Sequence, residues 1–212
     1  MGRHPGAPRQ LRRPGGPRLR GPARRVRDVH RRIRHRRWRC ANAVAITGPT
    51  DAIDTLWQDA HREEKGLLSA MAPLDEWDYQ DAISTWGTKW DVDVDDTSLS
   101  LHNRDDYSTI TGHFDTAWGP PTTAFNTWLD NNPDCEAELL FYEGGNDFCG
   151  SLEHGEMSLS NQTKDFFLNT ELGVKLDEAF GLLEMKEEYE EEEQNEALES
   201  PLILLDPEEE PV

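Results

Sequence analysis

The first 39 residues of this chain consist mostly of Arg, Gly, Pro and Ala, and apolar side chains recur there at neither the helical nor the strand period. Such a segment cannot bury enough apolar surface to offset the conformational entropy lost on folding. Prolines at positions 5, 8, 14, 17 and 22 also interrupt any regular element. We therefore expect residues 1–39 to be a disordered basic arm, with the fold beginning near Cys40.

This arm has three possible origins or roles. Its arginines could bind nucleic-acid phosphates, or it could be an intramolecular partner for an acidic tail. It could also be a mis-called gene start, because Arg, Gly, Pro and Ala all have GC-rich codons and a wrongly extended or shifted frame in GC-rich DNA has this composition.

Charge divides the chain into unlike parts. About fifteen of the 22 Lys and Arg lie before Cys40, with Asp28 the only acid there, so the arm carries about +14 and the rest about −34. Residues 186–212 are nearly all acidic and are expected to form a disordered tail, in which the apolar island at 201–205 is either a loose patch or a docking motif. Residues 156–185 are expected to be poorly defined and partly helical.

The three cysteines, Cys40, Cys135 and Cys149, form no even framework and no CxxC pair, which favours reduced, buried thiols. No apolar run approaches the roughly 20 residues that a membrane-spanning helix needs. We expect a cytoplasmic protein, and the sequence assigns it no cofactor and no metal.

Residues 40–155 have the alternating helix and strand periods of one domain. Strands are predicted over residues 43–47, 90–95, 108–115, 137–142 and 148–152, and helices over 50–60, 79–86 and from Pro120 and Pro121 to Asn132. The strands at 90–95 and 108–115 are expected to pair as an antiparallel hairpin. This order contains a βαββαβ unit, so we predict an α+β, ferredoxin-like split βαβ fold with helices on one face of an antiparallel sheet.

Asp91, His113 and Asp115 are candidates for catalytic chemistry. His113 and Asp115 share a strand face, and Asp91 on a paired strand could join them to hold Mg²⁺ or Mn²⁺ for hydrolysis, with Lys89 available to an anionic substrate. No phosphate loop, HExxH motif or nucleophile elbow accompanies them. We keep a metal-assisted hydrolase as an alternative and assign no catalytic residue.

Two further features allow a functional and a structural interpretation. Cys149 and His154 could form a nucleophilic pair, but the apolar strand around Cys149 favours an inert buried thiol. Trp86, Trp90 and Trp118 lie in joints flanked by Gly or Pro, where core packing competes with a ligand-stacking platform.

Four stretches together resemble the YubB-like ferredoxin-like domain family of phage and plasmid proteins: CAN at 40–42, WGTKWD at 86–91, FDTAWGPP at 114–121, and YEGG at 142–145 followed by FCG at 148–150. The resemblance covers residues 40 to about 155. It implies a ferredoxin-like fold and carriage on a mobile element, but no reaction. Family members commonly begin at a Met shortly before a Trp-Cys-x-Asn stretch, whereas Arg39 is inserted here, which favours the mis-called start.

The matched stretches also suggest where function lies. Their polar members, Lys89, Asp91, Asp115 and Glu143, are the candidate functional face. Structural roles are expected for the remaining members, namely Trp86, Gly87, Trp90, Trp118, Pro120, Pro121, Gly145, Phe148 and Gly150. We expect a non-enzymatic, acidic interaction module whose partner is a basic or nucleic-acid-binding host protein, or nucleic acid itself if the arm is translated.

Overall fold

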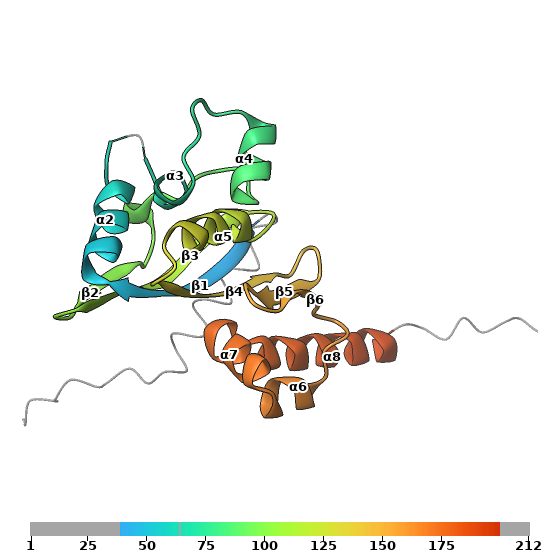
Figure 1. The fold of residues 1–212 in the computed structure, drawn as a ribbon. Coiled ribbons are helices and arrows are strands. Elements are labelled where there is room, and N and C mark those ends of the chain that lie inside the picture. The colour runs from blue at the N-terminus through green and yellow to red at the C-terminus, as the bar shows by residue number, and fades with distance from the viewer. Residues whose placement is uncertain (1–38, 64, 200–212) are drawn as a thin grey trace, which may run out of the picture.

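The computed structural model describes residues 39–63 and 65–199, apart from the side chains of residues 192–199. The predictions for residues 1–38 and 200–212 lie outside the described residues. Within them, the chain has an α+β fold in which helices cover both faces of an antiparallel sheet (Figure 1). None of the helices in these ranges is long and apolar enough to cross a membrane.

The sheet has the strand order β2-β3-β1-β4-β5-β6. β1 (Arg39–Pro49) lies at the centre, between β3 (Tyr107–Ala117) and β4 (Glu136–Glu143). β2 (Ser100–Asn103) forms one edge, and β5 (Phe148–Ser151) and β6 (Gly155–Ser158) extend the sheet to the other. The strands predicted at 43–47, 108–115, 137–142 and 148–152 are confirmed, although β1 and β3 are longer than predicted.

The first face of the sheet carries α2 (Thr50–Ala60), α3 (Leu67–Met71), α4 (Tyr79–Trp86) and α5 (Thr122–Asn131), drawn above it in Figure 1. Their apolar stripes pack on Val44, Ile46 and Phe141 of the sheet in one core. The predicted helices are confirmed. Gly87 ends α4 at a φ of +83°, a conformation that favours glycine, and Pro121 immediately precedes α5.

The second face is covered in part by α6 (Lys164–Asn169), α7 (Glu171–Phe180) and α8 (Leu182–Glu199). Leu176 and Phe180 pack against Leu140 and Tyr142 of β4 in a second core. The prediction that helices cover one face is therefore wrong, whereas residues 156–185, predicted to be partly helical, do contain α6 and α7. Apolar side chains on both faces of β4 need a cover on each side, and residues 156–185 provide the second.

Helix α8 also corrects the disordered tail predicted from residue 186, at least as far as Glu199. Leu182 and Met185 bury the start of the helix in the second core. The Lys164 ammonium then contacts the carboxylates of Glu187 at 3.5 Å and Glu190 at 3.1 Å. Glutamate has a high helix propensity, so a few anchoring contacts let an acidic run continue as a helix.

The strand predicted over residues 90–95 is wrong. This segment is a loop that ends in the 3₁₀ turn η1 (Val94–Asp96), and β3 pairs instead with β1 and β2. The alternation of residues 90–95 predicts that Trp90, Val92 and Val94 share a buried face; Val92 and Val94 are buried, but Trp90 is exposed. This backbone does not join the sheet because the side chains of Asp91 and Asp93 accept hydrogen bonds from nearby backbone amides and hold the segment as a loop.

Candidate functional site

The four stretches at residues 40–42, 86–91, 114–121 and 142–150 meet at one end of the sheet. Cys40 lies opposite Thr116 in the β1–β3 ladder, and Ala41 lies opposite Tyr142 in the β1–β4 ladder. Tyr142 in turn lies opposite Cys149 of β5. Segments far apart in the sequence thus build one region of the surface.

A buried polar network holds the loop that follows β3. The Asn42 amide nitrogen donates to Cys40 O at 2.9 Å and to Thr116 Oγ1 at 2.8 Å, and the Thr116 hydroxyl donates to Gly119 O at 2.8 Å. Asn42 is fully buried. Because buried polar groups are costly to leave unpaired, these bonds fix the direction in which residues 118–121 leave the sheet.

The loop after α4 is tied to the same strand end. A side chain at Gly87 would approach Pro120 O at 2.9 Å, and Thr88 hydrogen-bonds the backbone of Ala117. Residues 87–90 and 118–121 therefore form one rigid unit, which presents Lys89 and two tryptophans to solvent.

Four exposed aromatic side chains gather around Lys89. The Lys89 ammonium lies 4.6 Å from the ring centre of Trp90, 5.2 Å from that of Trp118 and 6.0 Å from that of Tyr79. The Trp77 indole N–H donates to the Lys89 carbonyl at 3.3 Å. We call these five residues the aromatic surface. The exposed fractions are 55% for Trp77 and Trp90, 40% for Tyr79 and 36% for Trp118.

Trp118 occupies an unusual backbone conformation. Its φ is +65°, and the Gly119 amide bonds back to Ala117 O at 2.8 Å across it, which makes a three-residue turn. A bulky residue is disfavoured at positive φ, and such strain persists where the surrounding structure imposes it. Here the strained turn aims a tryptophan at solvent beside Lys89.

An acidic segment borders the aromatic surface. Trp77 and Tyr79 alternate with exposed carboxylates in the loop before α4 and in its first turn, at Asp75, Glu76, Asp78 and Asp81. Asp78 also caps α4 by accepting from the amides of Gln80 and Asp81. Guanidinium and ammonium groups bind to aromatic faces through cation–π contacts and to carboxylates through charge-assisted hydrogen bonds, and this surface offers both.

Asp91 has a structural position. Its carboxylate accepts hydrogen bonds from the amides of Leu68 and Val92 at 2.7 Å, and from those of Gly66 and Ser69 at 3.1 Å. These bonds tie the loop to the first turn of α3, on the first face of the sheet. The carboxylate is fully engaged there.

The structure does not bring Asp91 to His113 and Asp115. Phe114 between them belongs to the first core, so His113 and Asp115 point to the opposite face, where Asp115 pairs with Arg39 at 3.0 Å. In the described ranges no group of three metal-ligating side chains is present. The geometry therefore gives no support to a shared metal site.

Other predicted residues have structural roles. Glu143 is buried and accepts a hydrogen bond from the Asn146 amide, which fixes the β4–β5 turn containing Gly145. Trp86 is buried and donates to Ala72 O at 2.7 Å. Phe148 packs edge-on against Phe141, and a side chain at Gly150 would clash with Gly155 O. Trp90 and Trp118, by contrast, lie outside the core.

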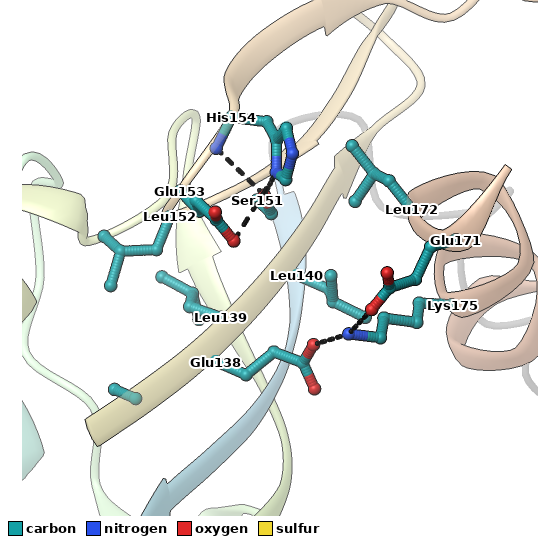
Figure 2. A pocket seen from close by; sticks show the side chains of 11 residues that line it. Glu138, Leu139, Leu140, Ser151, Leu152, Glu153, His154, Glu171, Leu172 and Lys175 are labelled. Atoms are coloured by element: carbon teal, nitrogen blue, oxygen red, sulfur yellow. Dashed lines mark hydrogen bonds and ion pairs between the residues drawn. The ribbon is translucent and has the colours of Figure 1, made fainter.

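A pocket of about 260 Å³ lies elsewhere, between β4, the β5–β6 turn and α7 (Figure 2). Lys175 crosses it and contacts the carboxylates of Glu138 at 2.8 Å and Glu171 at 3.0 Å. The hydrogen bonds that the Lys175 ammonium donates to these carboxylates raise the pKa of Lys175. A cation held between two carboxylates serves to link β4 with α7.

His154 and Ser151 at the same pocket do not form a nucleophilic pair. The Ser151 hydroxyl and the Glu153 carboxylate both contact Nδ1 of His154, at 3.0 Å and 4.0 Å, whereas a triad needs the two on different ring nitrogens (Figure 2). The contact closes the tight β5–β6 turn. Cys149 is fully buried, and burial raises the pKa of its thiol to about 11, so it is the inert thiol expected.

Trp77 and Tyr79 are the surface residues that the sequence analysis missed. The spacing of Tyr79, Ala82, Ile83 and Trp86 predicts one apolar face for the helix at 79–86, yet the Tyr79 ring is exposed at the start of that helix. The available signal was the alternation of acids and aromatics over residues 75–79, since carboxylates on both sides of an aromatic residue oppose burial of the segment.

A scan of protein-family models, a search of curated proteins and a search of solved structures each found no match to this chain. The resemblance to the YubB-like family therefore stays a prediction. The aromatic surface and its acidic border remain the features from which a function can be argued.

Proposed function

We propose that this chain is a non-enzymatic interaction module that binds a basic partner protein through the aromatic surface. The observation that carries the proposal is the meeting of Trp77, Tyr79, Trp90 and Trp118 around Lys89. Tryptophan and tyrosine dominate the binding energy of protein interfaces, and they are rarely gathered on a free surface without a use.

Rigidity supports this assignment. The Thr88–Ala117 and Asn42–Thr116 bonds hold the two loops before any partner arrives. A preorganised surface loses little conformational entropy on binding, so more of the contact energy appears as affinity.

Charge supports a basic partner. The whole chain has a formal net charge of −20, and the acidic segment places four carboxylates beside the rings. A field of this sign steers cations toward the surface and repels polyanions such as nucleic acid. The partner is then a host or mobile-element protein with a basic surface of the kind that binds nucleic acid.

The proposal includes a ferredoxin-like fold for residues 39–143. The antiparallel order β2-β3-β1-β4, with α2 after β1 and α5 after β3, supports it. β5, β6 and the second helical layer are additions to that plan. With the resemblance, this suggests a phage or plasmid protein that acts in the host cytoplasm.

The test is capture of host proteins on the tagged full chain, identification of the partner by mass spectrometry, and measurement of its affinity after purification. Tyr79→Ala and Trp90→Ala should each weaken binding at least about tenfold. Tyr107→Ala is the matched control, because Tyr107 is 54% exposed at the opposite end of β3. Equal affinity for Tyr79→Ala and Tyr107→Ala would rule out the aromatic surface.

Salt separates the two components of the proposed interface. Raising NaCl to about 0.5 M screens the acidic segment but leaves ring stacking in place, so affinity should fall without vanishing. A partner whose affinity does not change with salt would contradict the electrostatic component.

A further inference from the structure

The chain itself contains a basic segment whose end lies beside the aromatic surface. Arg39, the first residue of β1, lies opposite Ala117 in the sheet, and Trp118 follows Ala117 directly. The polypeptide before Arg39 thus joins the fold beside the end of β3, opposite the residue that precedes Trp118. Residues 24–38 hold eight arginines and a single acid, Asp28.

We propose that this arginine-rich segment, residues 24–38, docks on the aromatic surface of its own chain. The inference rests on the proposed function, since it takes the same surface to bind basic segments. It makes the arm an internal competitor, which a partner must displace before it can bind.

The chemistry of the two parts is complementary. A guanidinium group is planar and always charged, so it can stack on the exposed faces of Trp77 and Trp90 while its N–H groups bond carboxylates. The acidic segment supplies those carboxylates at Asp75, Glu76, Asp78 and Asp81. The Lys89 ammonium already lies over the rings of Trp90 and Trp118, which shows that this surface holds a cation.

The attachment point makes weak contacts sufficient. An extended chain spans at most about 3.5 Å per residue, so the eight residues before Arg39 reach up to about 28 Å from the end of β1. A short flexible tether gives an effective concentration in the millimolar range. Contacts that would bind a free peptide only weakly can therefore keep the surface occupied.

Helix α8 is the competing acidic surface. Its glutamates lie in the layer on the second face, and two of them, Glu187 and Glu190, already contact Lys164. The described part of α8 includes one tyrosine and no tryptophan. Stacking therefore favours the aromatic surface, and docking on α8 is an outcome that the test must detect.

The experiment compares the full chain with a full-chain variant that carries Arg31→Ser, Arg32→Ser, Arg34→Ser, Arg36→Ser and Arg37→Ser. Indole N–H resonances should shift between the two proteins for Trp77, Trp90 and Trp118, and not for the buried Trp86 and Trp128. A synthetic peptide of residues 24–38 added to the variant should move the same three signals back toward those of the full chain. Tyr79→Ala in the variant should weaken the peptide at least about fivefold, and Tyr107→Ala should not.

Three results would overturn the inference. The first is the absence of indole shifts, and the second is a shift confined to amides of α8. The third is shifts that grow with protein concentration, which would indicate binding between copies. An intact-mass measurement that finds the native product starting near Cys40 would also exclude docking of the arm in the cell.

A purified basic partner distinguishes this inference from the proposed function. If the arm competes, the partner should bind the five-serine variant about tenfold more tightly than the full chain. Equal affinity for both proteins would refute the inference and leave the proposed function intact. Binding that Tyr79→Ala fails to weaken, even in the five-serine variant, would refute the proposed function.

Discussion

The side chain of Thr88 and the backbone of Ala117 bond to each other twice. Oγ1 of Thr88 donates to Ala117 O at 2.9 Å and accepts from Ala117 N at 3.0 Å, and Thr88 is fully buried. A single hydroxyl thus bonds both the amide and the carbonyl of a residue at the end of β3, and the carbonyl also accepts from the Gly119 amide. It also joins the loop of Lys89 and Trp90 to the turn of Trp118.

Thr88→Val should destabilise the protein strongly for a change of one atom. Valine keeps the shape but leaves the buried Ala117 amide without its acceptor, while the Ala117 carbonyl keeps the bond from the Gly119 amide, so the free energy of unfolding should fall by about 2 kcal/mol. Urea denaturation measures this. Thr55→Val on the exposed side of α2 is the control and should cost less than about 0.5 kcal/mol. Similar losses for both variants would contradict the role given to Thr88.

Asp91→Asn tests the structural role of that carboxylate. Four amides donate to it, and an asparagine would turn an NH₂ group toward some of them, so the free energy of unfolding should fall by about 2–3 kcal/mol. Asp93→Asn is the matched comparison, because Asp93 accepts from the amide of Asp95 alone, and it should cost less than about 1 kcal/mol. If Asp91→Asn lowers the free energy of unfolding less than Asp93→Asn does, the loop before α3 does not depend on the Asp91 carboxylate.

Two glycines of the β5–β6 hairpin should respond differently to alanine. A Cβ at Gly150 would clash with Gly155 O and with the Phe141 ring, whereas one at Gly155 would meet nothing within 4 Å. Gly155 has a φ of +71°, so Gly155→Ala should cost about 1–2 kcal/mol of backbone strain. Gly150→Ala should cost more, by displacing β6 from β5. Thermal denaturation of both variants gives the order, and the reverse order would contradict this packing.

Stability should fall at alkaline pH through Cys149. Burial raises the pKa of this thiol from its ordinary value of 9.0 to about 11. Below pH 9 the thiol is protonated in both states. Between pH 9 and 11 the unfolded chain ionises first, so the free energy of unfolding should decrease by up to about 2–3 kcal/mol.

The control for this pH effect is Cys149→Ala. Burial also raises the pKa of Tyr142, with a smaller contribution from Cys149, and because both proteins keep Tyr142 the difference between their pH profiles reports the thiol and its effect on Tyr142. Parallel profiles from pH 8 to 11 would show that the thiol ionises with equal ease in the folded and unfolded chains.

Much of the first helical layer could be predicted because its signals are local. The spacing of Ile53, Leu56 and Ala60 places one face of α2 in the core, and Gly87 ends α4 through its own conformational freedom. The prediction of a strand over residues 90–95 was wrong for a physical reason. Alternate burial follows from any extended chain over a core, while strand pairing needs free amides on a neighbour, and Asp91 and Asp93 direct this backbone elsewhere.

The second helical layer and the aromatic surface depend on contacts that no local pattern shows. Ala41 and Ala43 leave room on the second face of β1, but only the fold reveals that α7 covers it beside β4. Likewise, Trp90 and Trp118 were picked out in the sequence, yet their exposure depends on how the loops at 87–90 and 118–121 are fixed to each other. The structure shows that Trp77 and Tyr79 join them.

The central place of β1 has a consequence for how the chain folds. β1 is the first strand made, yet its partners are residues 107–117 and 136–143, so its two ladders can form only after the chain has left the ribosome as far as residue 117 and residue 143. Contacts of such large sequence separation are slow to form. The newly made chain therefore exposes the apolar side chains of β1 for a long interval, which makes chaperone supply a determinant of yield.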